Sequence, residues 1–104
     1  MSAPRRDLNV QAMVGTNVLG SRIQGRQLRA LLEDVMETGE SVRLDFTGIE
    51  VLTSAFADEC FGKLWDSVPH GKLRQLIHLK GLTGNNKAVF QFVIAEHRDR
   101  GPGP

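Results

Sequence analysis

The stretch LDFTGIEVLTSAFADECFGKL, residues 44–64, changes from the periodicity of a strand to that of a helix. From residue 42 to residue 46, apolar and polar side chains alternate, which is typical of a strand with one buried face. From about residue 54 to residue 67, apolar side chains recur at intervals of three and four, which predicts an amphipathic helix. Thr53 and Ser54 therefore place two hydroxyl groups at the point where this helix begins.

The predicted helix 54–67 has an apolar face and a polar face. Its buried face is expected to contain Phe56, Cys60, Phe61, Leu64, Trp65 and Val68. Its solvent face is expected to contain Asp58, Glu59, Lys63 and Asp66, with Glu59 and Lys63 paired as i,i+4 neighbours. Since Cys60 is the single cysteine and lies on the apolar face, we predict a buried free thiol.

The residues before this stretch predict two further elements and a short strand at Val18-Leu19. Residues 8–14, LNVQAMV, alternate in polarity and predict a half-buried strand. Ser21 and Gln24 form a capping box for a helix that should stop near Gly39. Gly25 costs about 1 kcal/mol relative to alanine inside a helix. Close approach of another backbone or of a ligand would explain it, and so would a ragged first turn.

The residues after the stretch predict a third main strand and a last helix. The strand is expected at residues 73–79, LRQLIHL. Asn85 or Asn86 is expected to cap the final helix. The inner face of that helix is expected to contain Val89, Phe90, Val93, Ile94 and His97.

The predicted elements alternate between strand and helix, in the order β-α-β-α-β-α, which indicates an α/β domain. A sheet that is mixed or partly parallel, with helices mainly on one face, suits this alternation. We expect a flexible leader at residues 1–7, one domain over residues 8–98 and a flexible tail at residues 99–104.

Composition excludes several classes of function. The 13 Lys and Arg residues against 12 Asp and Glu give a net charge of +1, which argues against nucleic acid as the main ligand. No apolar run approaches the roughly 18 residues of a membrane span, and the N-terminus does not read as a signal peptide, so we expect a cytoplasmic protein and no membrane partner. Cysteine and histidine spacing predicts no metal site, and no cofactor is expected.

Asp45, Asn85 and Asn86 offer an alternative function in ligand binding or catalysis. Asp45 lies near the carboxyl end of a strand, where open α/β sheets bind ligands, or it accepts hydrogen bonds from the following turn. Asn85 and Asn86 either present an anion-binding helix start or act only as caps. Together these residues describe a small-molecule or nucleotide-binding subunit, or an enzyme.

Thr53 and Ser54 also admit two interpretations. One hydroxyl caps the helix, which is worth about 1 kcal/mol. Alternatively, one is phosphorylated, and the added charge of about −1.5 to −2 is tolerated at a helix N-terminus. A small neutral surface would then become anionic, and a partner packed against it would be expelled.

The segment VRLDFTGIEVLTSAFADE resembles the central signature of STAS domains, named for sulphate transporters and anti-anti-sigma factors. More closely, the chain resembles the STAS-like family of unknown function, whose helix reads S-x-F-x-[DE]-E-x-F-G-x-L. That pattern is matched by Ser54, Phe56, Asp58, Glu59, Phe61, Gly62 and Leu64. The resemblance covers about residues 8–97 and implies an α/β fold without enzymatic activity.

The resemblance also implies a bacterial regulatory protein that works by protein–protein interaction. In anti-anti-sigma proteins the partner is a histidine-kinase-like ATPase, which phosphorylates the signature serine, here Ser54 by motif position, with Thr53 as second candidate. The implied partner-binding residues are Asp45, Thr53, Ser54, Ala55, Asp58 and Glu59. A structural subunit that forms a homo-oligomer through an uncovered sheet face is a further possibility.

Overall fold

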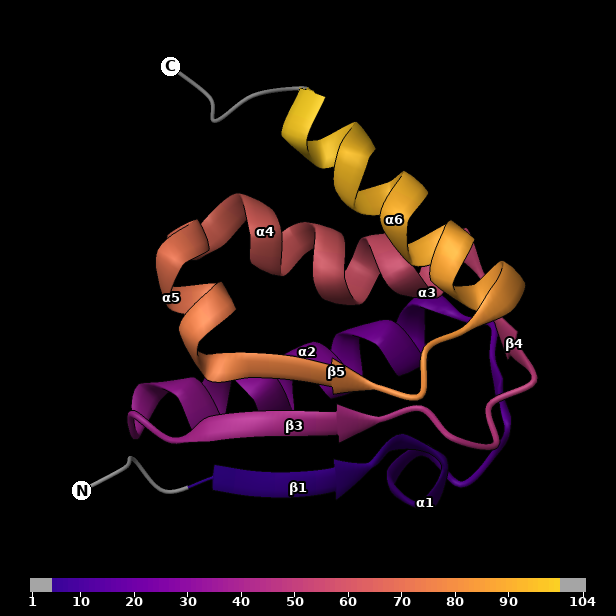
Figure 1. Cartoon of the computed structure of the whole chain (residues 1–104), viewed down its shortest axis with the longest axis horizontal. Coiled ribbons are helices and arrows are strands. Elements are labelled where there is room, and N and C mark those ends of the chain that lie inside the picture. The colour runs from indigo at the N-terminus through magenta and orange to yellow at the C-terminus, as the bar shows by residue number, and fades with distance from the viewer. Residues whose placement is uncertain (1–4, 100–104) are drawn as a thin grey trace.

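A computed structural model describes residues 5–99 of the chain. Its helices pack against one face of a three-stranded sheet, as Figure 1 shows. In chain order the elements are β1 (Arg5–Asn9), α1 (Val10–Val14), β2 (Val18–Leu19), α2 (Arg22–Glu37), β3 (Ser41–Asp45), β4 (Val51–Leu52), α3 (Ser54–Ala57), the π-helical turn η1 (Asp58–Gly62), α4 (Lys63–Ser67), α5 (His70–Leu76), β5 (Ile77–Lys80) and α6 (Gly84–Asp99). Mixed α/β architecture is therefore confirmed.

The sheet has the order β1-β3-β5, and β3 is its central strand. Its register aligns Leu8 with Leu44 and Leu44 with Leu79. A second, two-stranded sheet pairs β2 with β4. Every strand pair within residues 5–99 is parallel, as expected for strands joined by helical crossovers.

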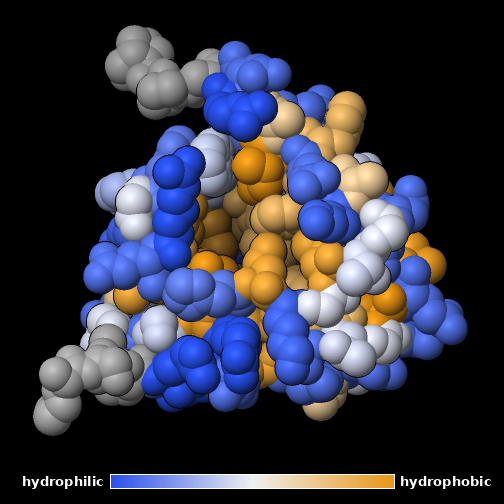
Figure 2. Space-filling model, viewed as in Figure 1, coloured by the Kyte–Doolittle hydropathy of each residue, from blue (hydrophilic) through white to orange (hydrophobic). Residues whose placement is uncertain are grey.

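The two faces of the main sheet differ in chemistry. Val42 and Leu44 on β3 are fully buried beneath the helices. Arg43 and Asp45 point to the other face, where Arg43 Nε lies 3.0 Å from Asp7 Oδ1. Figure 2 shows hydrophilic side chains over β1 and β3 in this view. The second face is therefore uncovered and polar, which agrees with the expectation of helices mainly on one face.

The helices form a layer in which α3, η1 and α4 follow one continuous path between α2 and α6. The core lies between this layer and the sheet. Its largest fully buried side chains are Phe46, Phe56, Leu19, Leu32, Leu44 and Leu64. Cys60 is a buried free thiol, as predicted, and burial raises its pKa.

Several local predictions are confirmed. The Ser21 hydroxyl accepts from Gln24 N at 3.1 Å, and the Gln24 side chain accepts from Ser21 N at 3.1 Å, which completes the capping box. Gly39 has φ of 80°, the left-handed conformation expected at a helix stop. Gly25 lies against the backbone of residue 56, so close approach of another backbone is the reason for glycine there.

The strand predicted at residues 8–14 is correct only for residues 8 and 9. Residues 5–9 form β1, and residues 10–14 form the short helix α1. Asn9 ends the strand because its side chain accepts from Ala12 N at 2.8 Å and so caps the helix. Residues 5–7 of the predicted leader thus belong to the sheet, while residues 1–4 lie outside the described residues.

The strand predicted at residues 73–79 is half wrong. Residues 70–76 form α5, and β5 occupies residues 77–80. The helix begins directly after Pro69, its N-cap, and Leu73 N donates to Pro69 O at 3.0 Å in its first turn. At the other end of the chain, Asp99 is the last residue of α6, so the predicted tail starts too early. Residues 100–104 lie outside the described residues.

The helix predicted at residues 54–67 is confirmed with two differences. The sequence did not indicate the π-helical turn η1 in its middle. Glu59, expected on the solvent face, is only 5% exposed. Its ion pair with Lys63 forms as predicted, at 3.0 Å. None of the helices in residues 5–99 combines the length and the hydrophobicity needed to span a membrane.

Candidate functional site

Thr53 is the residue that caps the helix. Its hydroxyl oxygen accepts from Phe56 N at 3.2 Å. The same hydroxyl lies 3.2 Å from Leu19 O and 3.1 Å from Gly20 O, the two carbonyls to which it can donate. Thr53 N also donates to Leu19 O at 3.0 Å. Thr53 therefore joins the helix start to β2, and its side chain is fully used within the fold.

Ser54 differs from its neighbour in every one of these respects. It is the first residue of α3, and it is exposed. Its hydroxyl makes no hydrogen bond to any residue between 5 and 99. The two hydroxyls at the helix start thus differ: the Thr53 hydroxyl is structural, and the Ser54 hydroxyl is exposed to solvent.

An apolar pair extends the surface around Ser54. Val18 and Val51 are register partners in the small sheet, and they are 41% and 43% exposed. Their neighbours Leu19 and Leu52 point inward and are buried. A methyl group at Gly20 would lie 3.8 Å from Val18 Cγ1 and 3.9 Å from Thr53 Cγ2, so the valine pair adjoins the helix start. We call Val18, Val51, Thr53, Ser54 and Ala55 the helix-start surface.

Sequence reasoning missed the two valines of this surface. The available signal was the repeated Val-Leu pair, at residues 18–19 and 51–52. In a two-residue strand only one of two adjacent side chains can point to the core, so one apolar residue of each pair had to face solvent.

Asp58 and Glu59, predicted to contact a partner, are engaged within the chain. Asp58 Oδ2 lies 2.9 Å from Arg22 Nη1. Glu59 Oε2 lies 2.9 Å from Arg29 Nη1 and 3.0 Å from Lys63 Nζ. Both arginines belong to α2, so these ion pairs fasten the helix path 54–67 to α2.

These contacts keep both carboxylates charged. The hydrogen bond from Lys63, aided by Arg29, lowers the pKa of Glu59 below its ordinary 4.5 despite desolvation. Burial acts to raise the pKa of Asp58, but hydrogen bonds from Arg22 and His97 outweigh it and leave that pKa below 3.8. A lowered pKa means that the charged form stabilises the fold.

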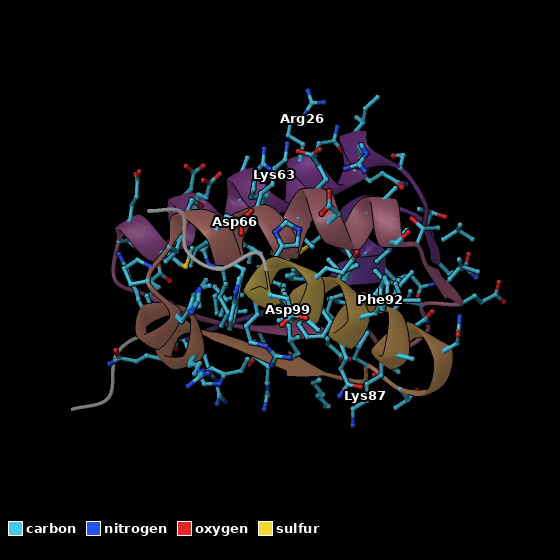
Figure 3. All side chains as sticks on the ribbon, turned by 90° about the horizontal axis from the view of Figure 1, so that it is seen from above. Arg26, Lys63, Asp66, Lys87, Phe92 and Asp99 are labelled. Atoms are coloured by element: carbon cyan, nitrogen blue, oxygen red, sulfur yellow. The ribbon has the colours of Figure 1, made fainter. Side chains whose placement is uncertain are left out.

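His97 fastens the other side of the same helix path. Its ring is 3% exposed, with Nε2 at 2.5 Å from Asp58 Oδ1 and Nδ1 at 2.8 Å from Asp66 Oδ2. A methyl group at Gly62 would overlap this ring, so glycine leaves the space that the histidine fills. Figure 3 shows Asp66 on α4 toward α6, and Lys63 toward α2. His97 therefore lies on the inner face of α6, as predicted, and both of its ring nitrogens have carboxylate partners.

The π-helical turn lies at the centre of these contacts. Lys63 N donates to Asp58 O, five residues earlier, in place of the usual four. Such turns are rare in proteins, and those that occur are often found at functional sites. Here the turn carries Asp58, Glu59 and Gly62, the residues that contact α2 on one side and α6 on the other.

Asp45 has the structural role that the sequence offered as one alternative. Its Oδ1 accepts from Thr47 N at 2.9 Å. Hydrogen bonds from the Thr47 side chain and backbone lower the pKa of this carboxyl. Asp45 borders a shallow polar depression of about 200 Å³ on the uncovered sheet face, with Asp7, Arg43 and Lys80.

Asn86 is not a cap, and it does not join Asp45 in a pocket. Its Oδ1 accepts from Leu52 N at 3.0 Å, and its Nδ2 donates to Ile49 O at 3.2 Å and to Glu50 O at 3.3 Å. It therefore fastens α6 to the segment that leads into the helix-start surface. Asn85 is exposed, and neither asparagine lines the depression at Asp45. Within residues 5–99, no cluster of three His, Cys, Asp or Glu residues has metal-binding geometry.

Comparison with known proteins identifies a family to which the chain is similar. The sequence model of a family described as a STAS-like domain of unknown function matches residues 24–87, more than half of the chain. The matched segment contains β3, the complete helix path 54–67 and β5. No curated protein and no solved structure matches the chain significantly.

Proposed function

The chain belongs to the STAS-like domain family of unknown function, and from this premise we propose that it is a non-enzymatic regulatory module that binds a partner protein through the helix-start surface. The partner class that its signature implies is a histidine-kinase-like ATPase of a bacterial signalling system. Ser54 would be the phosphorylation switch that controls this binding.

The observation that carries the proposal is the environment of Ser54. The exposed, unengaged Ser54 hydroxyl directly follows Thr53, which adjoins Val18, and both Val18 and Val51 are exposed. Apolar groups surrounded by polar ones are the usual composition of a docking patch. Thr53 is a poorer acceptor for a phosphoryl group, because its hydroxyl is committed to the backbone of residues 19, 20 and 56.

The position of Ser54 also fits a reversible switch. A phosphate there lies at the first residue of a helix, where the exposed backbone amides stabilise negative charge. Because no described contact of the fold uses the Ser54 hydroxyl, the domain keeps its structure on modification. What changes is the helix-start surface, which becomes anionic beside Val18 and Val51 and repels a partner fitted to the neutral form.

In this proposal Asp58 and Glu59 act indirectly. They hold the helix path between α2 and α6 and so fix the direction in which Ser54 points. Charged side chains such as Asp7 and Arg43 on the uncovered sheet face favour contact with water over self-association there.

The proposal is tested with the histidine-kinase-like ATPases of the source organism, each purified and assayed separately. Binding is measured by titration calorimetry for wild type, Ser54→Glu, Val51→Glu and the matched control Ser67→Glu. Ser67 is exposed at the other end of the same helix path, so it tests for a general effect of added charge. We expect Ser54→Glu and Val51→Glu each to weaken binding at least about tenfold, which corresponds to about 1.4 kcal/mol.

The kinase reaction gives a second readout. Incubation with the ATPase and labelled ATP is expected to phosphorylate wild type and Thr53→Ala, but not Ser54→Ala. If Ser54→Glu and wild type bound the ATPase equally well, Ser54 would not be the switch. If Ser54→Glu and Ser67→Glu lost the same amount of affinity, the helix-start surface would not be the docking site.

A further inference from the structure

An open apolar groove of about 200 Å³ lies beyond the free edge of β5, between α4, α5 and α6. Figure 2 shows hydrophobic side chains gathered around this hollow in the middle of the visible face. It shares no residue with the helix-start surface. The groove is therefore a second, separate feature of the molecule.

The floor of the groove belongs to the core. Phe61 and Leu64 line it, and both are buried. The Phe61 ring contacts Phe90 edge-on at a centroid distance of 5.3 Å and Phe46 at 6.0 Å. Because these rings hold one another in place, the groove exists without any rearrangement, which reduces the cost of binding a ligand.

Arg74 is the one charged residue among those that line the groove. Its guanidinium makes no ion pair or hydrogen bond with residues 5–99. The sequence from residue 67 to residue 95 contains no Asp or Glu, while Lys72 adds a further cation on α5. An unpaired guanidinium beside apolar side chains is suited to a carboxylate, which it can hold through two parallel hydrogen bonds.

The size of the groove limits its occupant. A cavity of roughly 150 Å³ holds a benzene ring, whereas drug-sized ligands occupy roughly 300–1,000 Å³. Stable protein interfaces cover roughly 800 Å² on each partner, far more than one short groove offers. The space therefore fits a single ring or a short alkyl chain.

We propose that this groove binds a small monocarboxylic acid with an apolar body. The ring or chain lies on Phe61 and Leu64, and the carboxylate pairs with Arg74 at the rim. The domain would thus have a ligand site distinct from its partner-docking surface.

Trp65 makes the proposal directly testable. It is the only tryptophan of the chain, it lines the groove, and its ring stacks on His70 at 3.7 Å. Its fluorescence is followed during titration with octanoate and 3-phenylpropionate, and with the uncharged octanol and 3-phenylpropanol. We expect saturable changes with both acids, with dissociation constants roughly between micromolar and millimolar for ligands of this size. Amide shifts in ¹⁵N spectra should be confined to η1, α4, α5, β5 and α6.

Three variants separate recognition from general attraction. Arg74→Gln is expected to weaken acid binding about tenfold and to leave alcohol binding unchanged. Lys72→Gln removes an exposed cation from the same helix without touching the groove, and it should bind the acids as wild type does. Ile94→Phe, which fills the groove, should weaken acids and alcohols alike.

Several outcomes would overturn the proposal. No saturable change up to the solubility of both acids would remove the site. Equal affinity of wild type for acid and alcohol, or equal losses in Arg74→Gln and Lys72→Gln, would remove Arg74 as the carboxylate partner. Binding of an acidic amphipathic peptide where neither acid binds would identify a protein as the occupant instead.

Discussion

Gly25 and Phe56 bring two helices into backbone contact: a methyl group at Gly25 would lie 2.7 Å from the Phe56 carbonyl oxygen. A methyl carbon and a carbonyl oxygen do not approach so closely, so a side chain at residue 25 would force α2 away from α3. The same methyl would lie 3.0 Å from Glu59 Cβ and 3.3 Å from Cys60 N. The packing of α2 against the helix path 54–67 thus depends on one missing side chain.

Gly25→Ala is therefore expected to destabilise the domain, although alanine is the better helix former. Overpacking of this kind costs about 1–3 kcal/mol. Gly71→Ala is the matched control, because nothing lies within 4 Å of a methyl group at Gly71 and because Gly71 also lies in a helix. The control should gain roughly 0.5–1 kcal/mol. Urea unfolding followed by circular dichroism measures both, and a neutral Gly25→Ala would contradict the helix–helix contact.

Thr53 and Ser54 should differ in their contribution to stability. Thr53→Ala removes the cap of the helix and is expected to cost about 1 kcal/mol. Ser54→Ala should stay within about 0.5 kcal/mol of wild type, as exposed substitutions usually do. Thr53→Ser keeps the hydroxyl and should retain most of the stability. If chemical unfolding showed the larger loss in Ser54→Ala, the assignment of Thr53 as the cap would be wrong.

His97→Ala should loosen α6 more than any exposed substitution on that helix. The variant leaves Asp58 and Asp66 without their shared partner and empties a buried site, and we expect a loss of about 2–4 kcal/mol. Arg98→Ala, next along the same helix and exposed, should cost little. Hydrogen exchange of the amides in residues 84–99 is the measurement. Faster exchange in both variants alike would show that His97 has no special role.

Acid should weaken the contact between α2 and the helix path 54–67. The pKa values of Glu59 and Asp58 are below their ordinary values of 4.5 and 3.8 in the folded chain. Their stabilising contribution is therefore fully present above about pH 5 and is lost as the pH falls through the lowered folded values.

Glu59→Gln should make the stability less dependent on pH, because the glutamine amide does not titrate. Asp34→Asn, an exposed substitution on α2, serves as the control and should keep the slope of wild type. Urea midpoints between pH 7 and pH 3 give the comparison. A Glu59→Gln protein with the full acid sensitivity of wild type would place the responsible groups elsewhere.

Features that depend on neighbouring residues were predictable from the sequence. The capping box of Ser21 and Gln24, the left-handed Gly39 and the ion pair of Glu59 with Lys63 each involve residues within four positions of one another. Gly25 was informative for a different reason. A glycine inside a strong helix pattern carries a cost, and close packing is one of the few explanations for it.

The errors arose where one pattern fits two structures. Val10 and Val14 are compatible with an alternating strand, but their spacing of four also fits one helical turn. The helix forms because the Asn9 side chain caps it. Residues 73–79 likewise combine the end of α5 with the start of β5. Short elements of this kind carry too few residues for either period to be established.

The burial of Glu59 depends on residues that are distant in the chain. On an isolated helix, the position of Glu59 relative to the apolar residues would place it on the solvent side. Arg29, which lies 30 positions earlier on α2, packs against Glu59 and covers it. In the same way, local sequence cannot decide which of two adjacent hydroxyls is a cap, because the choice depends on Leu19 and Gly20 across the small sheet. The helix start was therefore predicted from the sequence, but which of its two hydroxyls is the cap required coordinates.

The all-parallel sheet has a consequence for how the chain assembles. The central strand β3 pairs with β1 on one side and with β5 on the other, and no two adjacent strands in residues 5–99 are joined by a hairpin. No ladder can form until an intervening crossover has folded back on itself. A nascent chain that ends before residue 77 would leave one side of its most buried strand with unpaired amides. Completion of the sheet during synthesis must therefore wait for β5 to leave the ribosome.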